Sequence, residues 1–173
     1  MKRQRIIPTV AVYFLFLLAG CTPALPYRSA LLTPPPNCPQ PPGESVPAAC
    51  QSSMQEHTAS YDLLFVEFDD QGLLYPQDEE GVGEAWQQID NVMKQLRQIA
   101  SAENGISLFV FVHGWKHNAA PDDEYVVLFR KMLHAAALVE QSSQEPHRVV
   151  GIYLAWRGLS ATFSRPWRCI PKT

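Results

Sequence analysis

Residues 107–120 have the sequence S-L-F-V-F-V-H-G-W-K-H-N-A-A, and this stretch decides the fold. The run from Ser107 to Val112 is continuously apolar after its first residue, which predicts a strand covered on both faces of a sheet. A histidine, a glycine and a loop of small residues follow, and Pro121-Asp122-Asp123 then begins a helix with capping carboxylates. The stretch therefore predicts a buried strand, a loop at the carboxyl end of a sheet, and a helix.

The same alternation continues on both sides of this stretch. Tyr61 to Phe68 is a short aromatic and β-branched run closed by turn residues, which predicts a strand. Residues 84–100 predict a helix, and Arg148 to Trp156 predicts a last apolar strand after Pro146 ends the second helix. Strand, helix, strand, helix, strand is the order of an α/β fold with a mostly parallel sheet.

Each predicted helix carries apolar residues at intervals of three and four, and we expect these stripes to be buried. The stripe of the first helix contains Trp86, Ile89, Met93, Leu96, Ile99 and Ala100. The stripe of the second helix contains Tyr125, Leu128, Phe129, Met132, Ala136 and Val139.

The N-terminus predicts export from the cell. Residues 1–5 are basic, and the apolar run from Val10 to Ala19 is shorter than the roughly 20 residues that a permanent membrane helix needs. A cleaved signal peptide over residues 1–20 fits better. Leu18-Ala19-Gly20-Cys21 resembles the lipobox of bacterial lipoproteins, which implies that Cys21 becomes the N-terminus and carries thioether-linked diacylglycerol. The alternative is an ordinary signal peptide that ends by chance beside a cysteine.

Residues 21–57 are expected to form a proline-rich tether between this anchor and the folded domain. Nine of the 25 residues from Pro23 to Pro47 are proline, so too many backbone donors are missing for a helix or a central strand. An irregular coil lying on the domain is the alternative. Because export implies an oxidising compartment, Cys38 and Cys50 could pair across this tether, which leaves Cys169 over.

Composition limits the partners of the chain. With 173 residues, 46% hydrophobic and 18% charged, it has room for one globular domain. Its net charge is −3, and loss of Lys2, Arg3 and Arg5 with the signal peptide would make it −6, so no nucleic-acid partner is expected. No cofactor or metal is expected either: there is no C-x-x-C, and His113 and His117 flank a loop without an evident third ligand.

Three blocks of the sequence resemble a bacterial and fungal esterase/lipase-like group of α/β-hydrolases. They are F-V-E-F-D-D-Q-G at residues 65–72, F-V-H-G-W-K-H-N-A at 111–119, and V-V-G-I-Y-L-A-W-R-G at 149–158. The resemblance covers about residues 60–160 and implies that residues 58–160 are the N-terminal part of an α/β-hydrolase domain. It also implies that the loop His113, Gly114, Trp115 and Lys116 holds oxyanion donors, from Gly114 and from Trp115 or Lys116.

The resemblance stops before the nucleophile elbow. An α/β-hydrolase needs a serine within G-x-S-x-G, then an acid and a histidine. Residues 158–162, G-L-S-A-T, lack the second glycine, and no histidine follows His147, so Ser160 has no downstream base and fits a helix N-cap better. We expect a partial hydrolase layer, an irregular tail over residues 161–173, and an open sheet edge that aggregates or binds a protein partner.

Together these features predict an envelope lipoprotein held on membrane lipid through Cys21, on the exported side of the bacterial cell membrane or outer membrane. By resemblance it is related to serine hydrolases of small esters or amides, but it is expected to be inactive as written because nucleophile, acid and base are missing. A complete form would take such a substrate. The alternatives are a non-catalytic binding or structural module of the envelope, and a split enzyme completed by a second polypeptide.

Overall fold

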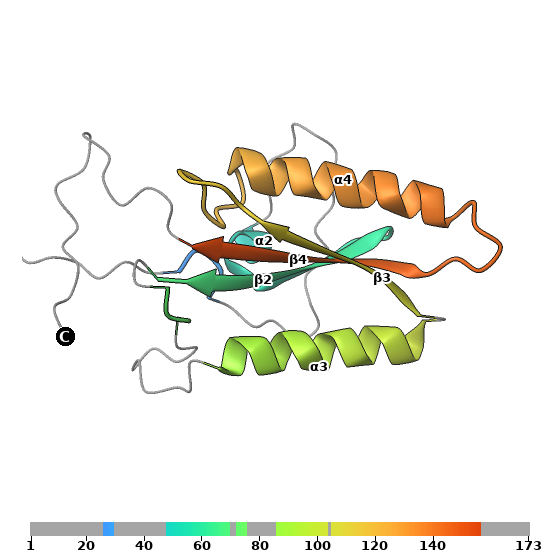
Figure 1. The fold of residues 1–173 in the computed structure, drawn as a ribbon, viewed down its shortest axis with the longest axis horizontal. Coiled ribbons are helices and arrows are strands. Elements are labelled where there is room, and N and C mark those ends of the chain that lie inside the picture. Colours follow the sequence, from blue (N-terminus) through green and yellow to red (C-terminus); the bar gives the residue numbers. More distant parts are fainter. Residues whose placement is uncertain (1–25, 30–47, 70–71, 76–85, 104, 157–173) are drawn as a thin grey trace, which may run out of the picture. The chain divides into compact units, whose positions relative to one another are not determined.

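The computed structural model describes residues 26–29, 48–69, 72–75, 86–103 and 105–156, all within the compact unit Leu25–Ser160. The expected signal peptide with Cys21, the tether around Cys38, Ser160 and the tail 161–173 lie outside the described residues. The described residues form a mixed α/β fold around one open four-stranded sheet (Figure 1). No helix among them is long and apolar enough to cross a membrane.

The sheet is mostly parallel, as the order of elements predicts. The elements are α2 (Ala48–Ser52), β1 (Gln55–His57), β2 (Tyr61–Phe68), α3 (Gln87–Ala102), β3 (Ile106–Val112), α4 (Glu124–Glu140) and β4 (Arg148–Trp156). The strand order is β1-β2-β4-β3, in which β1 is antiparallel to β2 and the other neighbours are parallel. The last strand is therefore inserted between the two earlier parallel strands.

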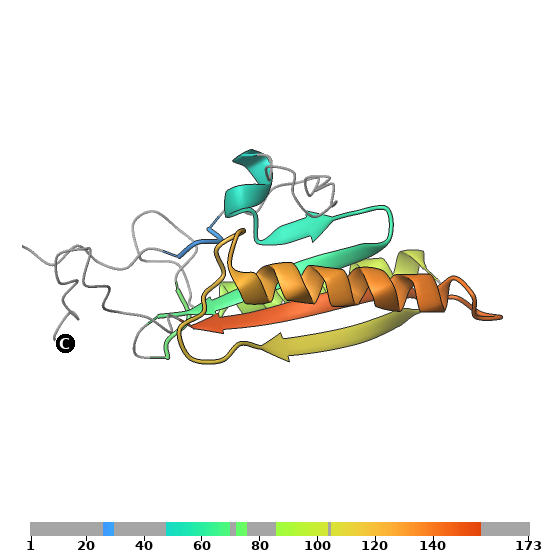
Figure 2. The same ribbon diagram turned by 90° about the horizontal axis from the view of Figure 1, so that it is seen from above.

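The two long helices cover opposite faces of the sheet (Figures 1 and 2). The core on the α4 side contains Tyr61, Leu63, Phe65, Ala119, Val126, Phe129, Leu133, Ala137, Val149, Tyr153 and Ala155, and the core on the α3 side contains Leu64, Val66, Val92, Leu96 and Val150. Gly151 lets α4 approach β4, because a Cβ at this position would lie 2.5 Å from Leu133 Cδ1. The sheet is thus the middle of three layers.

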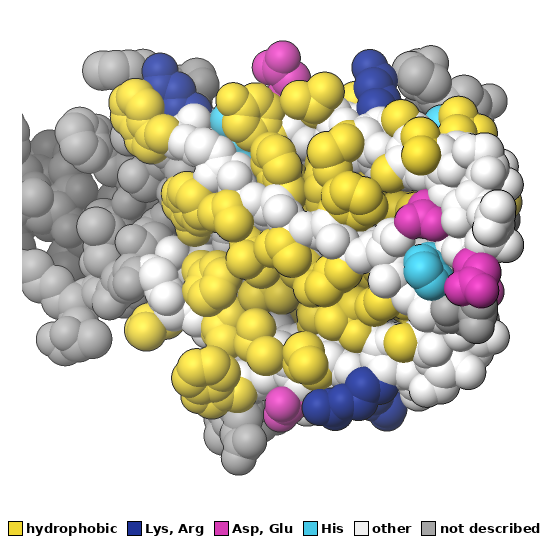
Figure 3. Space-filling model, turned by 45° about the vertical axis from the view of Figure 1, so that its right-hand side comes forward, with side chains coloured by type: hydrophobic (Ala, Val, Ile, Leu, Met, Phe, Trp, Pro, Cys, Tyr) yellow, Lys and Arg dark blue, Asp and Glu magenta, His cyan; other side chains and the backbone are white. Residues whose placement is uncertain are grey.

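The prediction that β3 is covered on both faces is wrong. β3 is an edge strand, and its side chains Leu108, Val110 and Val112 are 46%, 56% and 54% exposed. The cause is the position of α3, which packs on β2 and β4 and leaves this side of β3 open. Figure 3, which turns the β3 side of the molecule towards the viewer, shows hydrophobic side chains across its middle and charged groups mostly towards its margins.

The predicted stripes of the two helices are right only in part: in α3, Leu96 is buried and Ile89 and Ile99 pack against the core, as expected. In α3 the buried residues are Gln88, Val92 and Leu96, while Trp86, just before the helix, is 69% exposed. Gln88 turns inward because its amide Nε2 donates to the Glu67 carbonyl at 3.2 Å and its Oε1 accepts from the Glu67 amide at 3.0 Å. A glutamine that bonds to the backbone of a buried strand has no apolar signature.

In α4, Phe129 is buried and Tyr125 and Ala136 pack against the core as expected, but a charged residue also turns inside. The buried residues are Val126, Phe129, Arg130, Leu133 and Ala137, whereas the expected positions Leu128, Met132 and Val139 are exposed. Arg130 is buried because its guanidinium pairs with the carboxylate of Glu56 in β1. The apolar pattern of the helix alone could not reveal a partner 74 residues away.

The folded unit begins earlier than the expected tether boundary at residue 57. α2, β1 and residues 26–29 all belong to it, and Gln55 of β1 pairs with Leu64 of β2. β1 consists of Q-E-H, which lacks the apolar alternation by which a strand is recognised. Cys50 is disulfide-bonded. Its partner lies outside the described residues, so the pairing with Cys38 stays a prediction.

The open edge of β3 yields a first testable prediction. β3 contains no charged residue and no proline, so nothing in it opposes pairing with another strand. Replacing Val110 with lysine should reduce self-association of the purified chain, measured by sedimentation velocity over a range of concentrations. Leu138→Lys on α4 is the matched control, because it adds the same charge at a position of similar exposure. An equal reduction in both variants would indicate an effect of net charge and contradict pairing through β3.

Candidate functional site

The loop after β3 lies at the carboxyl ends of the parallel strands. In the sheet, Phe68 at the end of β2 pairs with Trp156 at the end of β4, and Val112 at the end of β3 pairs with Leu154. Residues 113–120 therefore emerge beside the last residues of β4. This edge is where open α/β sheets usually bind ligands.

His113 fastens this loop to β4. Its side chain is buried, and its Nε2 lies 2.8 Å from the backbone nitrogen of Trp156. A backbone N–H can only donate, so Nε2 is the acceptor and carries no proton. Nδ1 then carries the proton and donates to the Gly114 carbonyl at 2.7 Å. His113 is thus held as one neutral tautomer with both nitrogens occupied, which suits a structural role and leaves no nitrogen to accept a substrate proton.

His117 forms a pair with a carboxylate that the sequence analysis identified only as a helix cap. Its Nδ1 lies 3.1 Å from Asp123 Oδ1, and its ring stacks on Tyr125 with centroids 3.5 Å apart. Asp123 also caps α4, because it accepts from the Tyr125 amide at 2.9 Å, which confirms the predicted start of this helix. A histidine oriented by a carboxylate is two thirds of a nucleophile-activating triad. No hydroxyl or thiol in the described ranges is hydrogen-bonded to His117.

The turn between these histidines exposes backbone donors. Lys116 has a left-handed backbone with φ of +75°, and its Nζ lies 4.7 Å from the centre of the Trp115 ring. Within the described part of the chain, the amides of Gly114, Trp115 and Lys116 have no hydrogen-bond acceptor. A Cβ at Gly114 would make only an ordinary 3.7 Å contact with Tyr125. The turn therefore presents free N–H groups to solvent.

Sequence reasoning missed a buried ionic cluster beneath the loop. Glu56 is fully buried and binds Arg130 through two bonds, Nε to Oε2 at 2.9 Å and Nη2 to Oε1 at 2.5 Å. Arg28 Nη1 approaches the same Oε1 at 3.0 Å, and Arg28 Nε donates to the Ala119 carbonyl at 2.8 Å. The cluster joins the N-terminal segment, β1, α4 and the loop.

Burial sets the charge states around Arg28. It lowers the pKa of Arg28 to about 10, although the carboxylate of Glu56 opposes this shift, so the guanidinium stays charged at neutral pH. Burial also raises the pKa of Glu67. Its carboxylate accepts hydrogen bonds from the amides of Tyr27 (3.1 Å) and Arg28, and these bonds lower the pKa in part. A buried carboxylate at the end of β2 therefore holds the backbone of residues 27–28.

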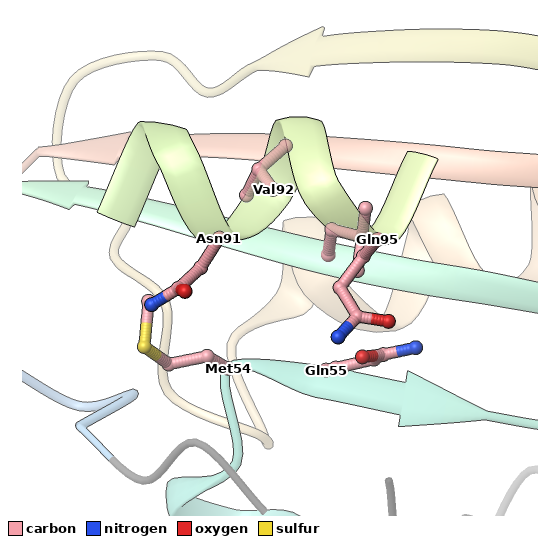
Figure 4. Close-up of a pocket in the computed structure, with 6 residues that line it drawn as sticks. Met54, Gln55, Asn91, Val92 and Gln95 are labelled. Carbon is pink, nitrogen blue, oxygen red and sulfur yellow. The ribbon is translucent and has the colours of Figure 1, made fainter. Parts of the chain in front are cut away.

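The described residues hold no metal-ligand cluster beside the loop. The described residues contain no group of three or more histidine, cysteine or acidic side chains that could hold a metal. Glu67 faces backbone amides and Asp69 Oδ1 accepts from the Leu73 amide at 2.8 Å, so these two do not converge on a cation. A pocket between β1 and α3, lined by Met54, Gln55, Leu64, Asn91, Val92 and Gln95, has room for about one water molecule (Figure 4).

Comparisons of the chain with known protein families, with curated proteins and with solved structures gave no match.

The ionic cluster yields a second prediction. Glu56→Ala leaves the guanidiniums of Arg28 and Arg130 buried without a carboxylate, so the free energy of unfolding should fall by about 3–5 kcal/mol. Urea unfolding measures the loss. Glu145→Ala removes an exposed carboxylate and serves as the control, with an expected change below about 0.5 kcal/mol. A loss for Glu56→Ala no larger than the control would contradict the role given to this cluster.

Glu67 yields a third prediction, on pH. Because burial raises its pKa above the ordinary 4.5, the folded state binds its proton more tightly, and this carboxyl removes stability as pH rises from about 4.5 towards its folded pKa. Glu67→Gln abolishes this titration. The difference in unfolding free energy, variant minus wild type, should therefore rise between pH 4 and pH 7, as measured by urea unfolding. Glu145→Gln should follow the wild type, and a constant difference between Glu67→Gln and wild type across this range would refute the assignment.

Proposed function

We propose that this chain is a lipid-anchored envelope protein related to serine ester and amide hydrolases, and that its 173 residues do not hydrolyse esters by themselves. The observation that carries the proposal is the loop after β3. It stands at the carboxyl ends of three parallel strands with the amides of Gly114, Trp115 and Lys116 free, and neither of its histidines contacts a described nucleophile.

The free amides fit one half of acyl-transfer chemistry. When a carbonyl is attacked, its oxygen gains negative charge, and prearranged backbone N–H groups stabilise that charge. The resemblance to α/β-hydrolases assigns this task to the loop 113–116. The order of β3, loop, α4 and β4 agrees with that assignment, and it supports the partial hydrolase layer as the finer description of the fold.

The other half of acyl-transfer chemistry is activation of a nucleophile by a base, and the described residues contain no such pair. A general base must lie within about 3 Å of the proton that it removes. Both ring nitrogens of His113 are hydrogen-bonded, one to the Gly114 carbonyl and the other to the Trp156 amide. His117 keeps Nε2 free but has Asp123 on its Nδ1 and no described hydroxyl within hydrogen-bond distance. These contacts support a protein that lacks turnover.

The open edge of β3 supports a protein partner that completes the sheet. Such a partner would add a strand beside Leu108, Val110 and Val112, and in a split enzyme it would also supply the serine. The second candidate function, a non-catalytic binding or structural module of the envelope, is favoured by the ionic cluster. The ion pair of Arg28 and Glu56 fixes the N-terminal segment on the domain, and a fixed segment suits a binding or structural role.

The test is an esterase assay with p-nitrophenyl esters of short and long acyl chains, combined with a fluorophosphonate probe that labels activated serines. We expect neither turnover above the uncatalysed rate nor labelling, because no base and nucleophile are paired among the described residues. A known serine hydrolase is the positive control. Turnover that disappears in Ser160→Ala would overturn the proposal and make Ser160 the nucleophile. Turnover that appears only on addition of a second polypeptide would identify the split enzyme.

A further inference from the structure

Large apolar side chains are exposed at the carboxyl end of the sheet. Trp115 is 75% exposed, Trp86 is 69% exposed and Leu73 is 60% exposed. A soluble protein rarely exposes several such side chains at one end without a partner for them.

The contacts of these residues place all three at this end. Trp115 is two residues beyond His113, which bonds to the end of β4. Trp86 precedes α3, whose second residue, Gln88, is bonded to the backbone of Glu67 in β2. Leu73 is hydrogen-bonded through its amide and carbonyl to Asp69, directly after β2. In Figure 1 the arrowheads of β2, β3 and β4 and the first turns of α3 and α4 lie at this same end.

The N-terminal segment also arrives at this end. The amide of Tyr27 donates to Glu67 Oε2 at 3.1 Å, and Glu67 is the next-to-last residue of β2. Cys21 is six residues before Tyr27, and an extended chain spans at most about 3.6 Å per residue. A lipid-bearing Cys21 would thus hold this end of the sheet within about 22 Å of the membrane.

We propose that the carboxyl end of the sheet docks on a lipid bilayer, with Trp115 and Trp86 in the headgroup region. The docking rests on the lipid anchor proposed above for Cys21. Tryptophan fits this position because its ring is apolar and its N–H is polar, the combination enriched at membrane interfaces. The docked face would turn the free amides of Gly114 to Lys116 towards the ester carbonyls of the bilayer.

The charges at this end identify the type of membrane binding. Lys116, whose Nζ lies over the Trp115 ring at 4.7 Å from its centre, can turn towards a lipid phosphate. Asp122 and Glu124, both exposed at the start of α4, offset the charge of Lys116 among the described residues, while Arg157, Arg165, Arg168 and Lys172 follow β4 outside them. The described part of this face therefore favours insertion of aromatic rings over attraction to anionic lipids. Docking should occur on zwitterionic phosphatidylcholine, and salt should have little effect on it there.

The experiment measures binding of the processed chain, residues 21–173 with Cys21→Ser, to phosphatidylcholine vesicles by co-sedimentation. Removing the lipid makes the contribution of the docking face visible. We expect measurable binding that falls about tenfold or more in the double variant Trp115→Ala, Trp86→Ala. The double variant Leu138→Ala, Val139→Ala removes exposed apolar side chains from the last turn of α4 and should bind within twofold of the parent. Near-UV circular dichroism and thermal unfolding check that both variants stay folded.

The outcomes separate the docking from the anchor. Equal binding of the two double variants, or no binding of the parent chain at millimolar lipid, would overturn the docking. Loss of phosphatidylcholine binding at high salt would overturn the aromatic mode of binding. The anchor is tested separately by incorporation of labelled palmitate into the wild-type chain and its loss in Cys21→Ser. Absence of that label would overturn the anchor, while vesicle binding would still decide the docking.

Discussion

One buried carboxylate, that of Glu56, joins three separate segments of the described fold, residues 26–29, β1 and α4. Arg28 and Arg130 both bind it, and they come from segments that no strand pairing connects. Two cations and one anion without solvent carry a large desolvation cost, which is recovered only while all three groups stay in contact. The Ala119 carbonyl accepts from Arg28 as well, so the geometry of the candidate loop depends on the same contact.

This dependence explains which parts of the fold could be predicted. The strands β2 and β4 and the cap at Asp123 follow from local patterns: β-branched runs, turn residues and a carboxylate before a helix. The buried faces of α3 and α4 could be predicted only in part: Leu96 and Phe129 are buried as expected, but Gln88 and Arg130 turn inward for partners far away in the sequence. The spacing of apolar residues does not reveal that a polar side chain is buried with a buried partner.

The candidate site divides in the same way. The loop 113–116 and its position after a strand could be predicted from the histidine and glycine that follow an apolar run, whereas the contacts of its side chains could not. The tautomer of His113 depends on the Trp156 amide, which parallel pairing brings near from 43 residues away. The exposure of β3 likewise depends on which strands α3 covers, and the residues of β3 carry no information on that.

The contacts of residues 27–28 also determine how the domain bears mechanical load. Without them, tension applied at an anchored N-terminus would reach α2 and then β1, an edge strand of three residues that can be peeled from β2 one pair at a time. Because the amides of Tyr27 and Arg28 are bound to Glu67 of β2, part of the pull would enter the sheet near its middle before it reaches α2 and β1. If the N-terminus is anchored, the bonds to Glu67 would therefore lower the load that reaches β1.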